Sequence, residues 1–294
     1  MLSNEFLDRA KKIALADVNY GEIFRDVPFL NSEDAIQRLE PADILIEYIP
    51  QFRPNIIHYN EFLLKGLMHI GIVVRFGETF YKIELLENGL FCDRCIFSQF
   101  EPFEHSVKRF FIVVRSKKVS SDDLLKKSLN ASIINYAGYE NREGNPVKMR
   151  EIKTNFFLRT HKLDKNVPLP DKLYCSELAY LAYLENGIEI CKLRSLDELA
   201  DMTGGFPARK DTKRILTHYS RGSMFLYSIF FLIAEYERLT VFLNLRSLGP
   251  SGILFKDGVW PNFIVENKDF DIVCTVPPYE MCIKEYEQLM SQKV

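Results

Sequence analysis

Residues 68–86 constrain the fold most, because they indicate two strands joined by a two-residue turn. The segments MHIGIVVRF (68–76) and TFYKIELL (79–86) are rich in β-branched and aromatic residues, and they flank Gly77-Glu78. A short turn between two such runs is typical of a β-hairpin. We therefore predict an antiparallel sheet built around this hairpin.

The rest of the chain mixes helical and strand patterns without repeats. Runs of β-branched and apolar residues predict further strands, and capping residues with helical spacing predict helices. The order is that of an α+β protein rather than of a doubly wound parallel sheet. We expect strands at 41–49 and 109–115, strand-like pieces at 253–265, helices at 4–16, 33–39, 120–130, 175–186, 195–202 and 279–291, and a loop, or lid, at 141–172.

The hairpin predicts a specific pair of polar side chains. A turn at Gly77-Glu78 places Glu84 opposite Gly71, so that His69 and Glu84 become diagonal neighbours on one face of the sheet. A carboxylate there can fix the tautomer of the imidazole, and Gly71 leaves room between them. The alternative is a polar pair on a solvated face, and a slip of one residue would separate the two side chains.

Cys175 stands at the start of a predicted helix rather than in its apolar stripe. Pro168 and Pro170 prevent a helix from entering from upstream, and Asn186-Gly187 is a good C-terminal cap. Unpaired N–H groups in a first helical turn favour a thiolate and can hold an oxyanion. The position suits a nucleophile, although a small buried core residue is the other reading of a free cysteine.

Four segments resemble the circularly permuted branch of the NlpC-type papain-like cysteine hydrolases, the YiiX-like group. Residues 42–45 (ADIL) resemble its opening Gly-Asp-Ile-Leu, and 69–73 (HIGIV) resemble its catalytic-histidine strand. Glu84 stands where that group has an acidic residue on the next strand. Residues 174–178 (YCSEL) resemble its nucleophile helix, and the downstream Gly187-Ile188 matches too.

The resemblance covers about residues 38–200 and implies a papain-like α+β fold, with an antiparallel sheet packed on the nucleophile helix. It implies Cys175 as nucleophile, His69 as base and Glu84 as orienting residue, in the permuted order. The sequence departs from the group at Ala42, which replaces the usual glycine. Residues 136–140 match a Gly-x-Pro-Tyr-Asp segment only loosely, and the stretch from there to Cys175 is long for the group.

The expected reaction is hydrolysis of an amide bond, peptide or isopeptide, through an acyl-enzyme that needs no metal or nucleotide cofactor. Tyr174, Ser176 and Asp43 are candidates for substrate binding or for the oxyanion pocket. Tyr174 could instead only pack, and Asp43 could only start a strand.

Two alternatives to an amidase remain open. Lecithin:retinol acyltransferase-like enzymes share the permuted layout and act on lipids, and the apolar block at 224–234 keeps a lipid acyl hydrolase or acyltransferase open. That block is too short to span a membrane, so we expect a buried helix rather than one that lies on a membrane. The second alternative is a papain-like module that binds a partner without catalysis.

Composition and charge limit which binding partners and which cellular compartment we expect. The chain has 294 residues with a net charge of -2, which gives no electrostatic reason to expect nucleic acid binding. The first 17 residues suggest an amphipathic helix rather than a signal peptide, so we expect a cytoplasmic protein with free thiols, with export by a route without a cleaved signal left open. We expect a hydrolase domain at 1–204 and a C-terminal extension of unknown role at 205–294, packed on it.

Other candidate motifs are weaker. Cys92 and Cys95 form a CxxC pair, but zinc would need a second pair of ligands at suitable spacing. His58, His105, His161 and His218 have no sequence partner, and only His161, in the predicted lid, suggests a substrate contact.

Overall fold

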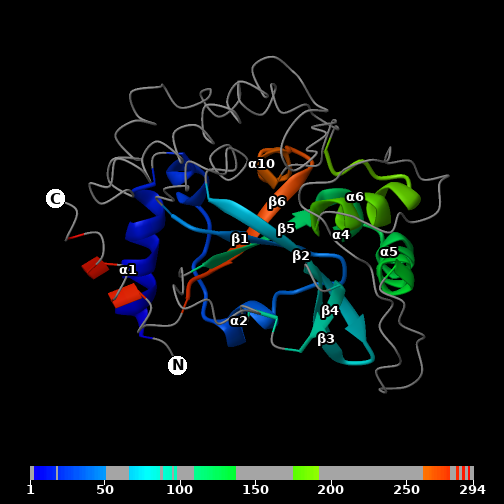
Figure 1. Ribbon diagram of the computed structural model, residues 1–294, viewed down its shortest axis with the longest axis horizontal. Coiled ribbons are helices and arrows are strands. Elements are labelled where there is room, and N and C mark those ends of the chain that lie inside the picture. Colours follow the sequence, from blue (N-terminus) through cyan, green and yellow to red (C-terminus); the bar gives the residue numbers. More distant parts are fainter. Residues whose placement is uncertain are drawn as a thin grey trace, which may run out of the picture.

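The computed structural model describes residues 3–17, 19–50, 66–86, 89–94, 96–97, 109–136, 175–191, 261–278, 283–284, 287–288 and 291. Its centre is a six-stranded sheet in the order β4-β3-β2-β1-β5-β6, in which all neighbouring strands are antiparallel (Figure 1). The strands are β1 (Ile44–Tyr48), β2 (Leu67–Phe76), β3 (Thr79–Leu86), β4 (Gly89–Asp93), β5 (Phe110–Ser116) and β6 (Phe270–Val276).

The predicted hairpin forms as β2 and β3. Gly77 and Glu78 make the turn, with Gly77 at a positive φ of 58°. Gly71 pairs with Glu84, as the two-residue turn requires. β1 then pairs with the other edge of β2, so the hairpin supplies the middle of the sheet.

Helices surround the sheet, and the longest described helices lie at its two sides (Figure 1). α1 lies at one side, and α5 and α6 lie together at the other. The described helices are α1 (Asn4–Leu15), the 3-10 helix η1 (Gly21–Phe24), α2 (Ser32–Ile36), α4 (Lys117–Ser120), α5 (Asp123–Tyr136), α6 (Cys175–Glu185) and α10 (Pro261–Val265).

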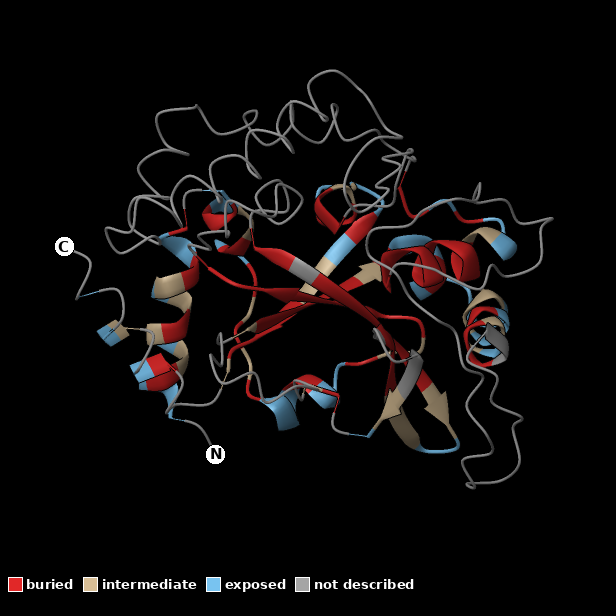
Figure 2. Cartoon of the chain, in the orientation of Figure 1, coloured by how far each residue is buried: buried red, intermediate tan, exposed pale blue. Residues whose placement is uncertain are grey.

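Strand alternation divides the core into two clusters. On β1, Ile44 and Ile46 belong to a large cluster that includes α1, α5 and α6, whereas Leu45 belongs to a smaller one that includes Ala35 of α2. Figure 2 shows that the central strands are buried along most of their length. The sheet is therefore covered on both faces, so polar groups on it must find partners inside the protein.

Helix α6 is buried on all sides from Cys175 to Tyr183, rather than along a single stripe. The Tyr183 hydroxyl donates a hydrogen bond to the Ala42 carbonyl at 2.6 Å, which ties the helix to the start of β1. Ala42 itself adopts a positive φ of 75°. This explains in backbone terms why glycine would be the easier residue at that position.

The end of α6 is the predicted cap. Gly187 has φ 74°, its N–H bonds to the Leu184 carbonyl, and the N–H of Ile188 bonds to the Tyr183 carbonyl. These two bonds form a Schellman motif, which satisfies the last carbonyls of the helix.

The C-terminal region differs from its prediction. Residues 261–265 form helix α10 instead of a strand-like piece, because Pro261 suits the first position of a helix. The strand lies later, as β6, and it pairs with β5. Residues 261–278 therefore contribute to the same sheet as the segments before residue 204, while the expected boundary at 204 lies outside the described residues.

The α+β class and the antiparallel sheet are confirmed. The expected elements at 195–202, the loop at 141–172 and the apolar block at 224–234 lie outside the described residues. Among the residues that are described, none belongs to a helix with the length and apolar character needed to cross a membrane. The described cysteines, Cys92, Cys175, Cys191 and Cys274, are not joined by disulfides.

The cap predicts the effect of a single substitution. Replacing Gly187 by Ala puts a Cβ into a left-handed conformation, so the free energy of unfolding should fall by about 1 kcal/mol. Nothing lies within 4 Å of the added Cβ, so a steric clash would not contribute. Gly187→Asn should cost less, since asparagine tolerates this conformation. Equal urea midpoints for wild type and Gly187→Ala would contradict the cap.

Candidate active site

Cys175 is the first residue of α6 and is buried, with 6% of its surface exposed. The backbone N–H groups of a first helical turn have no partner within the helix. The thiol therefore lies at the positive end of the helix dipole, as the sequence predicted.

The hairpin register brings His69 and Glu84 together. His69 Nε2 lies 3.1 Å from Glu84 Oε2, and both side chains are buried. This confirms the predicted diagonal pair and excludes the solvated-face alternative. A one-residue slip would have destroyed it.

An irregularity in the β1–β2 pairing adjoins His69. Glu47 pairs with His69, but the next residue, Tyr48, pairs with Leu67, so the pairing skips Met68. Such bulges re-aim side chains and are frequent beside active sites. No sequence pattern indicates this irregularity.

Cys175 also acts on the His69 ring, because its charge and its hydrogen bonding raise the pKa of the imidazole. Because Nε2 is bonded to Glu84, Nδ1 is the ring nitrogen left for the thiol. The two residues come from β2 and from the start of α6, which are distant in sequence. The structure therefore brings together the three predicted residues, Cys175, His69 and Glu84.

The electrostatics of this group favour a charged imidazole. Burial acts to lower the pKa of His69. Other effects outweigh burial and raise the pKa to about 10: the charge of Cys175, hydrogen bonding with Cys175 and Glu84, and the charge of Glu47. A raised pKa means that the imidazolium form persists through neutral pH. The structure thus places a cysteine beside a histidine whose charged form is favoured.

The Glu84 carboxyl is held in its charged form. Burial acts to raise its pKa, but the hydrogen bond from His69 and the charge of Lys82 hold the pKa below its ordinary value. Glu84 therefore accepts hydrogen bonds as a carboxylate at neutral pH.

Two charged residues near His69 were missed by the sequence analysis. Lys82 Nζ lies 2.9 Å from Glu84 Oε1, and both side chains are 1% exposed. Glu47 is buried next to His69 and accepts a hydrogen bond from Arg109. Strand alternation could have found Lys82, because it stands two residues before Glu84 and shares its face.

The sequence predicts open space at Gly71, between His69 and Glu84, but the structure fills that space. A Cβ built on Gly71 would lie 2.9 Å from Lys82 Cγ and 3.0 Å from Lys82 Cδ. The space above Gly71 is therefore occupied by the stem of Lys82, rather than kept open between the histidine and the carboxylate.

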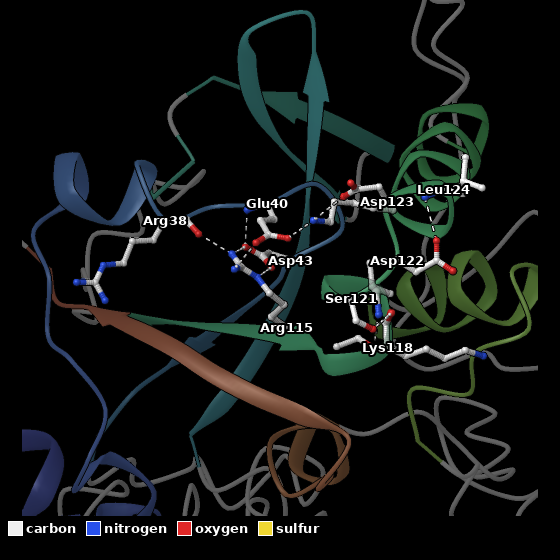
Figure 3. A network of polar contacts seen from close by, with 12 residues as sticks. Arg38, Glu40, Asp43, Arg115, Lys118, Ser121, Asp122, Asp123 and Leu124 are labelled. Atoms are coloured by element: carbon white, nitrogen blue, oxygen red, sulfur yellow. Dashed lines mark hydrogen bonds and ion pairs between the residues drawn. The ribbon is translucent and has the colours of Figure 1, made fainter.

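Asp43 lies away from this group. Arg115 donates to both of its carboxylate oxygens at 2.7 Å, and Arg115 also contacts Glu40 (Figure 3). Asp43 precedes β1, whereas Glu47, the partner of His69, lies four residues further on, or about 13 Å along a strand. Asp43 is thus not brought together with His69, and burial raises the pKa of its carboxyl.

The remaining predicted site residues are placed as follows. Ser176 is buried in the first turn of α6, beside Cys175, and Tyr174 lies outside the described residues. Cys92 of the CxxC pair is on β4, and Cys95 is not described. Within the described ranges, no three or more His, Cys, Asp or Glu side chains are grouped so as to hold a metal ion.

Comparisons with known proteins do not identify a family for this chain. No protein-family model matches the chain, and no curated protein matches it. Among solved structures, the metalloprotein yiiX from Escherichia coli O157:H7 is similar with a TM-score of 0.41 and 14% sequence identity, over 82% of this chain and 97% of that one. Similarity this low carries no argument about function.

The Cys175–His69 contact predicts a measurable change in the histidine. Cys175→Ala removes a charge and a hydrogen bond that raise the pKa of His69, so the pKa should fall from about 10 toward 6.5. Imidazole resonances followed by NMR against pH would measure this. Cys92→Ala, on β4, should leave the His69 titration unchanged, and an unchanged titration in Cys175→Ala would contradict the contact.

Proposed function

We propose that this protein is a cysteine hydrolase that cleaves an amide bond, peptide or isopeptide, through an acyl-enzyme on Cys175. One observation supports this most: buried His69 is hydrogen bonded to Glu84 and interacts with Cys175, which raises the pKa of the imidazole. A nucleophile, a base and a residue that orients the base are the elements of a catalytic triad.

In the proposed reaction, the Cys175 thiolate attacks the substrate carbonyl carbon. The His69 imidazolium then gives its proton to the leaving amine as the carbon–nitrogen bond breaks, which leaves a thioester on Cys175. Water attacks the thioester, His69 takes a proton from that water, and the acid product leaves with the thiolate restored. Glu84 remains a carboxylate throughout and orients the ring.

The helix start contributes a second element. The tetrahedral intermediate carries a negative oxygen, and backbone N–H groups are effective donors to it. In the proposal, the N–H of Cys175, the first residue of α6, supplies one such donor.

The proposal also includes a papain-like relationship. An antiparallel sheet with α6 packed on it, and the order His69, Glu84, Cys175 along the chain, fit the permuted NlpC-type arrangement that the sequence resembles. The resemblance is the reason for expecting an amide as substrate.

Alkylation of Cys175 tests the activated thiol. We expect iodoacetamide to modify Cys175 at about pH 6 almost as fast as at about pH 9, and His69→Ala to slow the reaction at about pH 6 by tenfold or more. Peptide mass spectrometry would follow each cysteine separately. Cys92, which is half-buried, is the internal control and should react as an ordinary thiol.

The same experiment separates an enzyme from a binding module. A Cys175 alkylation rate that rises with pH as an ordinary thiol does, and that is the same in His69→Ala, would contradict catalysis and leave a papain-like interaction module. Activity on acyl lipids in vesicles, with none on peptide amides, would contradict the amide substrate while leaving the triad intact.

A further inference from the structure

Lys82 is buried and forms an ion pair with Glu84, the residue that is hydrogen bonded to His69. Its ammonium lies 2.9 Å from Glu84 Oε1, while the other oxygen of the same carboxylate, Oε2, lies 3.1 Å from His69 Nε2. Each oxygen of Glu84 therefore faces a different side chain, Lys82 or His69. The carboxylate is held from both sides, so its orientation toward the imidazole depends on Lys82 as well as on its own strand.

Packing fixes where Lys82 can lie. Its stem passes over Gly71 on the neighbouring strand, where even a Cβ would come within 2.9 Å of Cγ. The ammonium also lies 5.5 Å from the centre of the Phe111 ring, on β5. The Lys82 side chain thus packs over Gly71, and its ammonium lies near the Phe111 ring.

Burying a charged lysine costs free energy of hydration unless an opposite charge and hydrogen bonds compensate for it. Replacing a buried ion pair by apolar residues of similar size is often neutral or stabilising, so stability alone gives a weak reason for Lys82. The ammonium of Lys82 places a positive charge next to the Glu84 carboxylate. This charge opposes protonation of the buried carboxyl group.

We propose that Lys82 is a positioning residue, which keeps Glu84 charged and turned toward His69 and so acts on the reaction without touching the substrate. This rests on the proposed function, because positioning matters only where His69 activates Cys175. Gly71 belongs to the same arrangement, because a residue without a Cβ at this position leaves space for the Lys82 side chain.

The first test removes the ammonium with little change in length. In Lys82→Met the Glu84 carboxyl should titrate at higher pH than in wild type, followed by side-chain carbon NMR. Alkylation of Cys175 at about pH 5 should fall roughly tenfold, and Lys82→Arg should restore much of it. In a His69→Ala background, Lys82→Met should have no further effect on alkylation.

The two proposals fail in different ways. If His69→Ala itself leaves alkylation unchanged, the proposed function fails, and the Glu84 titration still decides whether Lys82 keeps the carboxylate charged. If His69→Ala slows alkylation but Lys82→Met changes neither the rate nor the Glu84 titration, Lys82 is only structural and the inference is wrong.

A second test begins with Gly71→Ala in the wild-type background, where an unchanged alkylation rate would overturn the inference even if Lys82→Met does not fold. Gly71→Ala should displace the Lys82 stem and slow alkylation several-fold in the wild-type background. In a Lys82→Ala background the same substitution meets no stem, so it should have little effect. Equal effects in both backgrounds would show that Gly71 acts independently of Lys82 and would overturn the inference.

Discussion

The pairing of Gly71 with Glu84 is the constraint on which the candidate site depends. It follows from a two-residue turn, and it places His69 and Glu84 as diagonal neighbours on one face of the sheet. The central strands are covered on both faces, so this polar pair is removed from water. A carboxylate and an imidazole in that environment interact more strongly than at a surface, because the local dielectric is low.

The site is a chain of buried polar side chains in which each member interacts with a neighbour. Lys82 faces Glu84, Glu84 faces His69, and His69 faces Cys175. Glu47 adds a further negative charge beside His69 and is itself bonded to Arg109. Removing one member leaves another uncompensated, which is more costly than the loss of a single contact. Substitutions in this chain should therefore couple strongly.

Local patterns predicted much of this architecture. Period-two alternation and the Gly77-Glu78 turn predicted the hairpin register, and a capping signal at Gly187 predicted the end of α6. Both features are decided by residues close in sequence. The resemblance added the third member, Cys175, which no local pattern could have joined to His69.

What was missed depends on contacts between distant segments. The sequence does not predict β6, because its place beside β5 is set by the whole sheet. Residues 261–265 resemble a strand in their apolar character, but they begin with Pro261 and form α10. Lys82 was missed because a lysine on a strand is ordinarily exposed. Its burial follows from an absent Cβ at Gly71 and from the carboxylate of Glu84, which only the folded chain brings together.

The proposed function depends on Cys175 and His69 forming a thiolate–imidazolium pair. The most direct measurement is the ultraviolet difference spectrum between wild type and Cys175→Ser at about pH 6, where an ordinary thiol is protonated. The account predicts thiolate absorbance in the wild type, and its loss when His69→Ala is compared with the double variant His69→Ala/Cys175→Ser. A wild type without thiolate absorbance at that pH would contradict it.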